Sequence, residues 1–248
     1  MEIFENERID FVNDKLSLIQ KTDGLTFGTD ALLLSAYISG GYKRGLEIGS
    51  GSGIISMLIL TRERVNHVNA IEVQADYAVL TERNAKLNNL GDRLSVICSD
   101  IRDYNGDEVD LVFTNPPYMK NNSGRMNLHN SKCIARHEIK GDIFDFLAAA
   151  RKNLKFGGAF YCVYRPDRLA DLIFAMKKNE IEPKRITAVH ANTLSEPSML
   201  LIEGKRGAKS SLKFTKPFII YNDELNRDYS DEMNYVMENG AFPAEYQK

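Results

Sequence analysis

The chain lacks the features of a secreted or membrane-bound protein. No apolar run approaches the roughly 18 residues that a membrane-spanning helix needs. The acidic N-terminal segment, Met1 to Glu7, has no apolar core of the kind found in signal peptides. The three cysteines are odd in number and share no CxxC spacing, which argues against a disulfide framework and a thiolate zinc site. We therefore expect a soluble cytoplasmic protein with no metal centre, no membrane contact and no obligate protein partner.

The chain also lacks a strong excess of charge of one sign. Its 32 basic and 34 acidic residues leave a formal net charge of −2, which does not by itself indicate a nucleic-acid-binding protein. Two segments, 120–140 and 203–216, depart from this balance, each with five basic residues against one acidic residue. Such segments either follow a phosphate backbone or form a solvated surface, and charge alone does not separate the two.

No repeat, low-complexity tract or Pro/Ser-rich linker divides the 248 residues, and this length suits a single α/β domain. Residues 1–40 are expected to form a small β-hairpin, turning at Thr22-Asp23-Gly24, and a helix with Thr29 or Asp30 as N-cap. Residues 41–204 form the predicted core. Residues 205–248 are a predicted C-terminal extension, with a short strand and a helix, packed on that core.

The core alternates strands and helices. Repeated βα units predict a doubly wound, mostly parallel sheet with helices on both faces. The predicted strands are 44–48, 67–71, 94–98, 109–114, 159–164, 185–190 and 198–203. The predicted helices are 54–61, 74–88, 142–154, with Gly157-Gly158 as its stop signal, and 166–179.

A glycine-rich loop follows the first predicted core strand. Glu47-Ile-Gly-Ser-Gly-Ser-Gly53 places Gly49, Gly51 and Gly53 between that strand and a helix. Glycine lets the backbone turn tightly and approach a ligand closely. The dinucleotide fingerprint is GxGxxG, and here the third glycine comes one residue early, which disfavours a dehydrogenase. A glycine turn alone is weak support, because many strand-to-helix loops use glycine for packing.

Two acidic residues follow the next two strands at the same edge of the predicted sheet. Glu72 ends the second strand and Asp100 follows the third. In open parallel sheets, ligands bind outside the carboxyl ends of the strands. The Glu72 carboxylate can accept hydrogen bonds from both ribose hydroxyls of an adenosine, and Asp100 from the adenine amino group. Each acid alone is typical of a solvated loop, but three such strand ends together are a stronger signal for a cofactor site.

With these three strand ends, residues 44–203 resemble the class I, Rossmann-like S-adenosylmethionine-dependent methyltransferases. The resemblance implies S-adenosyl-L-methionine as cofactor, with the glycine loop around its amino-acid part, Glu72 at the ribose and Asp100 at the adenine. The family usually carries Asp or Glu where this chain has Glu47, and the resemblance implies that Glu47 is a further cofactor-binding residue. It also implies a seven-stranded sheet whose last strand runs antiparallel beside the fifth.

The fourth predicted strand runs directly into Asn115-Pro116-Pro117-Tyr118. Prolines end a strand because they cannot donate to a β-ladder, so the simplest interpretation is a strand terminator. The alternative is catalytic. An exocyclic amine on a planar base or a carboxamide is a poor nucleophile, because its lone pair is delocalised. Asn115 Oδ1 and the Pro116 carbonyl can each accept one N–H and present the lone pair to the methyl donor, while Tyr118 stacks on the substrate.

This tetrapeptide matches the (D/N/S)PPY signature of methyltransferases that act on adenine N6, cytosine N4 or guanine N2, and on a glutamine of release factors. The DNA enzymes usually carry a separate target-recognition domain and the release-factor enzymes a helical N-terminal domain, and neither pattern is found here. The whole chain resembles the small bacterial enzymes that methylate N6 of the adenine 3′ to the anticodon of a valine tRNA. The residues that carry this resemblance are Arg8-Ile-Asp10, Phe27-Gly-Thr-Asp-Ala-Leu-Leu-Leu34, Asn115–Tyr118, Ala135-Arg-His-Glu138 and Pro197-Ser-Met-Leu-Leu201.

The resemblance has consequences for the site and the partner. Gly28, Thr29 and Asp30 are expected to close over the methionine end of the cofactor, with Lys15–Gln20 at the pocket edge and Asn115 next to it. The same glycine, threonine and aspartate also fit an ordinary helix N-cap, and both interpretations can hold. A tRNA substrate also gives the basic segment 120–140 a role, which is to contact the phosphates of the RNA. The residues expected to contact RNA are Lys120, Arg125, Lys132 and Arg136.

Other functions remain open at the level of the sequence. The same tetrapeptide would serve a guanine-N2 methyltransferase of ribosomal RNA or a glutamine-N5 methyltransferase of release factors. A non-catalytic RNA-binding protein is a more remote alternative, and the intact Asn115–Tyr118 tetrapeptide argues against it.

Overall fold

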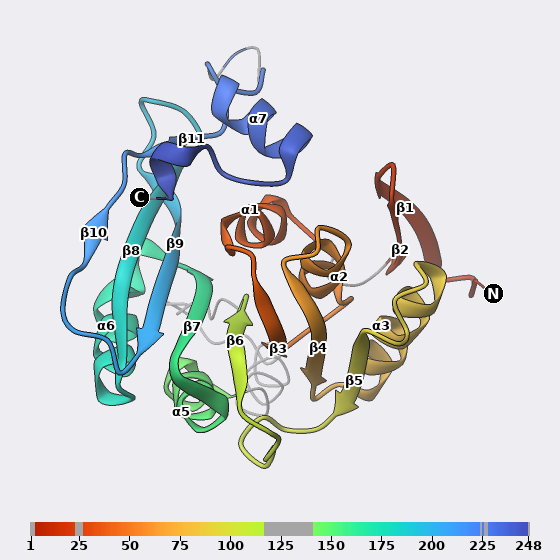
Figure 1. Ribbon diagram of the computed structural model, residues 1–248. Helices are drawn as coiled ribbons and strands as arrows, with labels where there is room; N and C mark the ends of the chain where they lie inside the picture. The colour runs from red at the N-terminus through yellow and green to blue at the C-terminus, as the bar shows by residue number, and fades with distance from the viewer. Residues whose placement is uncertain (1–2, 23–26, 117–140, 224, 226–227, 248) are drawn as a thin grey trace, which may run out of the picture.

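The computed structural model describes residues 3–22, 27–116, 141–223, 225 and 228–247, and Figure 1 shows their arrangement. A nine-stranded mixed sheet has the order β10-β8-β9-β7-β6-β3-β4-β5, with β11 also paired to β8. A separate two-stranded sheet, β1-β2, lies beside α3 and α2 (Figure 1). Within the described residues no helix has the length and apolar character needed to cross a membrane.

The bounds of the elements are as follows. The strands are β1 Glu7–Asn13, β2 Leu16–Lys21, β3 Tyr42–Ile48, β4 Val65–Glu72, β5 Leu94–Cys98, β6 Val109–Thr114, β7 Leu154–Tyr164, β8 Ile181–His190, β9 Pro197–Arg206, β10 Lys213–Phe214 and β11 Phe218–Ile219. The α-helices are α1 Thr29–Tyr37, α2 Ile54–Thr61, α3 Ala75–Leu87, α5 Ile143–Asn153, α6 Leu169–Lys178 and α7 Asp231–Asn239. Two short 3₁₀ helices are η1 Pro166–Arg168 and η2 Ala244–Tyr246.

The sheet is buried on both faces. Side chains alternate across a strand, and β7 shows this clearly, since Phe160 and Cys162 join one core cluster while Tyr161 and Val163 join the other. The first cluster lies under α5 and α6, and the second lies under α1, α2 and α7. This is the doubly wound α/β architecture that the repeated βα units predict.

The predicted fold class is confirmed. The seven predicted core strands all form, and β9, the last of them, runs antiparallel between β7 and β8. The sheet nevertheless has nine strands rather than seven, because the C-terminal extension adds β10 and β11, which both pair parallel with β8. The division of the chain into segments 1–40, 41–204 and 205–248 stays a prediction.

The predicted turn of the N-terminal hairpin is wrong. Asn13 pairs with Leu16, so the chain reverses at Asp14-Lys15. Asp23 and Gly24, the expected turn residues, lie outside the described residues. In this turn the Lys15 N–H donates to Oδ1 of Asn13 at 2.9 Å. The side chains of Asn84 on α3 and of its C-cap Asn88 each bond both backbone groups of a β2 residue and hold the hairpin against α3.

The predicted stop of helix α5 is also wrong. The helix ends at Asn153, and strand β7 begins at the next residue, so Gly157 and Gly158 lie inside the strand. The pairing of β7 with β6 is irregular at this point, and Gly157 has a φ of 79°. Glycine is therefore needed for a backbone irregularity within the strand and not for a helix end.

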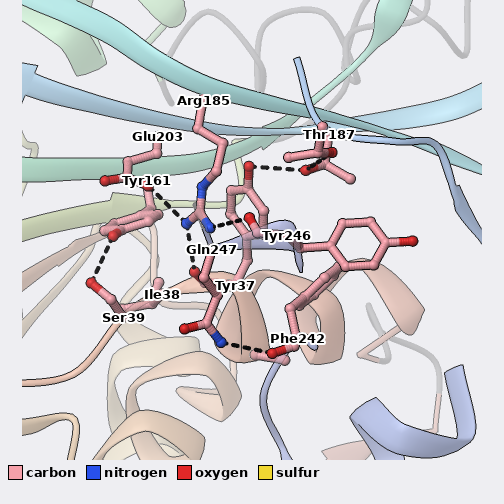
Figure 2. Close-up of polar contacts among 12 residues, drawn as sticks. Tyr37, Ile38, Ser39, Tyr161, Arg185, Thr187, Glu203, Phe242, Tyr246 and Gln247 are labelled. Carbon is pink, nitrogen blue, oxygen red and sulfur yellow. Dashed lines mark hydrogen bonds and ion pairs between the residues drawn. The ribbon is translucent and has the colours of Figure 1, made fainter. Parts of the chain in front are cut away.

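A buried arginine ties the C-terminal extension to the core (Figure 2). The Arg185 guanidinium donates to the backbone oxygens of Tyr246 and Tyr37, forms an ion pair with Glu203 at 2.7 Å, and lies 4.1 Å from the centroid of the Tyr37 ring. A buried charge needs partners, and these neighbours give the guanidinium both hydrogen-bond acceptors and a carboxylate of opposite charge. The chain end is thereby fixed against α1 and β8.

Candidate active site

The glycine loop makes a tight turn at the end of β3. Gly49, Gly51 and Gly53 have φ of 74°, 55° and 81°, in the left-handed region that glycine adopts without strain. The backbone N–H groups of Gly49 and Ser50 donate to the carbonyl of Ile71 on the neighbouring strand β4. The loop is thus held directly against the end of the next strand.

Different glycines serve different purposes. A Cβ at Gly53 would lie 2.6 Å from Cγ2 of Thr81, so this glycine is needed for the packing of α3 on the loop. At Gly49 and Gly51 a Cβ would meet nothing within 4 Å, so open space adjoins the loop there. The buried Ser50 hydroxyl has no hydrogen-bond partner among the described residues. Open space beside a backbone turn and an unsatisfied hydroxyl fit a bound polar ligand.

Glu72 lies against the glycine loop at the end of β4. The residue is 5% exposed, and its carboxylate accepts hydrogen bonds from the Gly51 N–H at 2.9 Å, the Gln74 N–H at 3.0 Å and Nε2 of Gln74 at 3.3 Å. No lysine or arginine of the described ranges forms an ion pair with it. A carboxylate has about four lone-pair sites, so one site is left for a ribose hydroxyl, and a second becomes available if the Gln74 side chain turns away.

Asn84 joins the glycine loop to the N-terminal hairpin. Its amide, on α3, donates to the carbonyls of Ser52 and Ile19 and accepts from the N–H of Ile19. This fully buried side chain therefore holds β2 next to the loop. The predicted position of Lys15–Gln20 near the cofactor pocket is compatible with this contact.

Glu47 is buried below the loop rather than beside the open space. Its side chain is 1% exposed and accepts a hydrogen bond from the Ser56 hydroxyl of α2. Burial raises the pKa of Glu47 to about 8, against the opposing effect of the Ser56 bond. The raised pKa favours the protonated carboxyl, and the hydrogen bond with Ser56 links β3 to α2.

Asp100 follows β5, at the strand end where the sequence places it. Its carboxylate accepts from the backbone N–H of Arg102 at 2.9 Å and forms an ion pair with the Arg102 guanidinium. These hydrogen bonds hold the pKa of Asp100 below its ordinary value. An adenine amino group at this position would share the carboxylate with Arg102.

Asn115 and Pro116 follow β6, the strand next to β3. Thr114, which is fully buried, donates through its hydroxyl to the carbonyl of Ile48 at 2.8 Å and fixes the end of the strand. Asn115 is half-buried, and its side chain donates through Nδ2 to Oδ2 of Asp30 at 2.8 Å. The structure therefore brings together the first tetrapeptide residue and the start of α1.

Asp30 is not the N-cap of α1, and neither is Thr29. The helix begins at Thr29, with Gly28 as N-cap and without a capping side chain. The predicted cap is wrong because the Asp30 carboxylate is directed to Asn115 instead.

A cavity of about 910 Å³ opens beside Asp30. Its walls come from the start of α1, the end of β7 with η1, and the start of β9. The lining residues are Thr29, Asp30, Arg165, Pro166, Asp167, Glu196, Pro197, Ser198 and Met199. Because β6 lies between β3 and β7 in the sheet (Figure 1), Asn115 lies between the glycine loop and this cavity.

Four lining residues carry no role predicted from the sequence: Arg165, Pro166, Asp167 and Glu196. The first three directly follow the fifth core strand, so the rule that ligands bind at carboxyl strand ends could have identified them. Glu196 precedes an antiparallel strand, and no local signal marks it. The predicted site residues Pro117, Tyr118, Lys120, Arg125, Lys132 and Arg136 lie outside the described residues.

Comparisons with known proteins agree on one family. The family model of the methyltransferase small domain matches residues 21–178. The tRNA1(Val) (adenine(37)-N6)-methyltransferase of Aeromonas hydrophila is 31% identical over 197 residues, which cover 79% of this chain and 80% of that protein.

Solved structures show the same fold. A predicted O-methyltransferase of Agrobacterium tumefaciens has a TM-score of 0.70 at 20% identity and covers 86% of this chain and 98% of its own. M. jannaschii TYW2, solved in complex with AdoMet, has a TM-score of 0.58 at 16% identity and covers 83% of this chain and 88% of its own.

The matched range contains the glycine loop, Glu72, Asp100, Asn115 and Asp30. The roles of these individual residues remain predictions. The predicted enzyme class and S-adenosylmethionine as the cofactor are confirmed, and the chain belongs to the methyltransferase small domain family of Rossmann-like S-adenosylmethionine-dependent methyltransferases.

Proposed function

We propose that the protein methylates N6 of an adenine in tRNA, next to the anticodon. The observation that carries the proposal is the place of Asn115, at the end of the strand between the glycine loop and the cavity beside Asp30. The Aeromonas hydrophila relative, named for adenine 37 of a valine tRNA, supports the choice of acceptor. A tRNA substrate also gives the basic segment 120–140 a role, and it leads us to propose a cytoplasmic location.

The glycine loop and Glu72 form the proposed cofactor site. The loop backbone at Gly49 and Gly51 would contact the amino-acid part, and the Glu72 carboxylate would accept from the ribose hydroxyls. Asp100 would lie at the adenine. S-adenosylmethionine, when bound, supplies an electrophilic methyl group on a sulfonium.

Asn115 and Pro116 form the proposed amine site. The amine needs two acceptors to turn its lone pair out of the plane of the base, and Asn115 Oδ1 and the Pro116 carbonyl are the candidates. Asn115 is held by a buried strand end and by Asp30, so the acceptor is positioned before the substrate arrives. Positioned dipoles of this kind stabilise developing charge without reorganisation. The cavity beside Asp30 would receive the nucleotide or its neighbours.

A change of a single base in the substrate tests this acceptor. A tRNA transcript with adenine 3′ to the anticodon should accept labelled methyl, and the same transcript with guanine at that position should not. If the guanine transcript is methylated equally well, the amine acceptor or its position in the RNA is wrong. If neither transcript is methylated but a release factor is, the chemistry stands and the tRNA assignment fails.

Replacing Glu72 by alanine should weaken cofactor binding. The loss of charge-assisted hydrogen bonds to the ribose, together with release of the Gly51 N–H, is expected to cost about 1.5–3 kcal/mol. Isothermal titration calorimetry with S-adenosylhomocysteine measures this, and Glu82→Ala, on exposed α3 surface, is the control. An unchanged affinity would remove Glu72 from the site. Tight binding of NAD in a parallel titration would contradict the cofactor assignment.

Neutralising the basic segment should weaken tRNA binding. With Lys120, Arg125, Lys132 and Arg136 all replaced by glutamine, the slope of log affinity against log salt should flatten by up to about 0.9 per lost phosphate contact. Affinity for S-adenosylhomocysteine should stay the same. The matched control is neutralisation of Lys205 and Lys209, in the other basic segment. If the slope does not change, these four charges are only a solvated surface.

A further inference from the structure

The contact between Asp30 and Asn115 joins the start of α1 to the end of β6, 85 positions apart in the sequence. Nδ2 of Asn115 donates to Oδ2 of Asp30 over 2.8 Å. A carboxylate only accepts hydrogen bonds, whereas an amide has one donor end and one acceptor end. The contact therefore turns the NH₂ end of Asn115 toward α1 and turns Oδ1 away from it.

Asp30 and Asn115 both belong to segments whose neighbouring residues are buried. Asp30 is in the first turn of α1, and its neighbour Ala31 and, one turn later, Leu34 are buried in the core. Asn115 directly follows Thr114, which is fully buried and bonded to the Ile48 carbonyl. Because neither backbone can shift without disturbing the core, the hydrogen bond sets the side-chain orientation of Asn115 and not the position of a loop.

Gly28 leaves the space that the carboxylate occupies. A Cβ at this position would lie 2.7 Å from Oδ1 of Asp30, which is closer than a Cβ normally approaches any atom. The φ of Gly28 is −117°, a value that every residue can adopt. Glycine thus leaves room for the Asp30 carboxylate in this orientation, and any larger residue would require that carboxylate to shift.

We propose that Asp30 is a positioning residue for methyl transfer, which holds the Asn115 amide with Oδ1 facing the acceptor amine. The inference rests on the proposed function of Asn115 as an amine acceptor. It assigns to Asp30 a role other than the cofactor contact expected from the family resemblance. If the amide turned over, its NH₂ group would face the amine N–H, and two donors cannot bond to each other.

A double-mutant cycle tests the dependence of Asp30 on Asn115. Asp30→Ala should lower the single-turnover rate by at least about tenfold, and by no more than Asn115→Ala does. In the Asn115→Ala background, adding Asp30→Ala should cause no further loss, because the amide that Asp30 orients is gone. Affinity for S-adenosylhomocysteine, measured by calorimetry, should change by less than about threefold in all variants.

An exchange of the two side chains provides the matched rescue. Asn115→Asp alone sets two carboxylates face to face, and its rate should fall as far as that of Asn115→Ala. In the double variant Asp30→Asn/Asn115→Asp, the amide at position 30 donates to the carboxylate at position 115, whose other oxygen still accepts from the amine. Its rate should return to within about tenfold of wild type.

The outcomes separate this inference from the proposed function. Every variant is assayed on the acceptor that the wild type methylates, whether tRNA, ribosomal RNA or a release factor. The identity of that acceptor decides the proposed function, and the ratios among the variants decide the role of Asp30. Three results would each overturn the inference. The rate losses of the two alanine variants could multiply in the double variant, or the exchange variant could be no faster than Asn115→Ala. The third is an Asp30→Ala protein that loses cofactor affinity but keeps a normal single-turnover rate.

Discussion

Replacing Asn115 by alanine is expected to lower the single-turnover rate of methyl transfer by at least about 10²-fold, comparable to the loss of one positioned donor in an oxyanion hole. The variant removes one of two acceptors that present the amine lone pair. It leaves the hydrogen bond between the Gly51 N–H and Glu72 in place, because the hydrogen bond that the variant removes joins Asn115 to Asp30. Affinities for S-adenosylhomocysteine and for tRNA should change far less, since this hydrogen bond matters most in the transition state.

The companion variants at Tyr118 separate stacking from hydrogen bonding. Tyr118→Phe should be mild and Tyr118→Ala severe, because stacking on a base needs the ring and not the hydroxyl. Rapid-quench single-turnover assays on an anticodon stem-loop, with equilibrium binding of both ligands, measure the series. A near-normal rate for Asn115→Ala would contradict its catalytic role, whatever the Tyr118 variants do.

Replacing Arg185 by alanine is expected to destabilise the folded protein by about 3 kcal/mol, at the lower end for a broken buried ion pair because Glu203 is partly exposed. The variant leaves the Glu203 carboxylate without this partner and the backbone oxygens of Tyr37 and Tyr246 without their donors (Figure 2). It also removes the cation from the face of the Tyr37 ring.

Urea unfolding followed by circular dichroism measures the loss. The matched control is Arg151→Ala, which breaks the exposed pair with Glu180 and should cost at most about 1 kcal/mol. If Arg185→Ala is no less stable than this control, the buried network does not fix the C-terminal extension to the core.

Much of the fold follows from the sequence. The periodicity and strand ends of the core predict α2, β5 and β6 with the bounds that the structure shows. The glycine loop, Glu72, Asp100 and Asn115 were predicted at one edge of the sheet, because the carboxyl ends of parallel strands share that edge. The structure places each of them there.

What the sequence could not show depends on contacts between distant segments. The hairpin turns at Asp14-Lys15, where Asn13 bonds the Lys15 N–H, although Asp23-Gly24 is the stronger local turn signal. Asn84 and Asn88 hold β2 against α3, a contact that no local pattern predicts. The local sequence marks Arg185 only as a charged residue of a strand. Its hydrogen-bond acceptors, on α1 and near the chain end, are visible only in the structure. The pairing of Asp30 with Asn115 has no local signal at all, and the helix-cap pattern around Asp30 favours a different partner.

The most direct test of the acceptor is a map of the product. Total tRNA lacking the modification is incubated with the protein and S-adenosylmethionine, digested to nucleosides and oligonucleotides, and analysed by mass spectrometry. We expect N6-methyladenosine in a single oligonucleotide, at the adenine 3′ to the anticodon, and its absence when Asn115→Ala replaces the wild type. Methylated guanine or cytosine, N6-methyladenosine elsewhere in the tRNA, or methyl transfer only to a protein would contradict the proposed function.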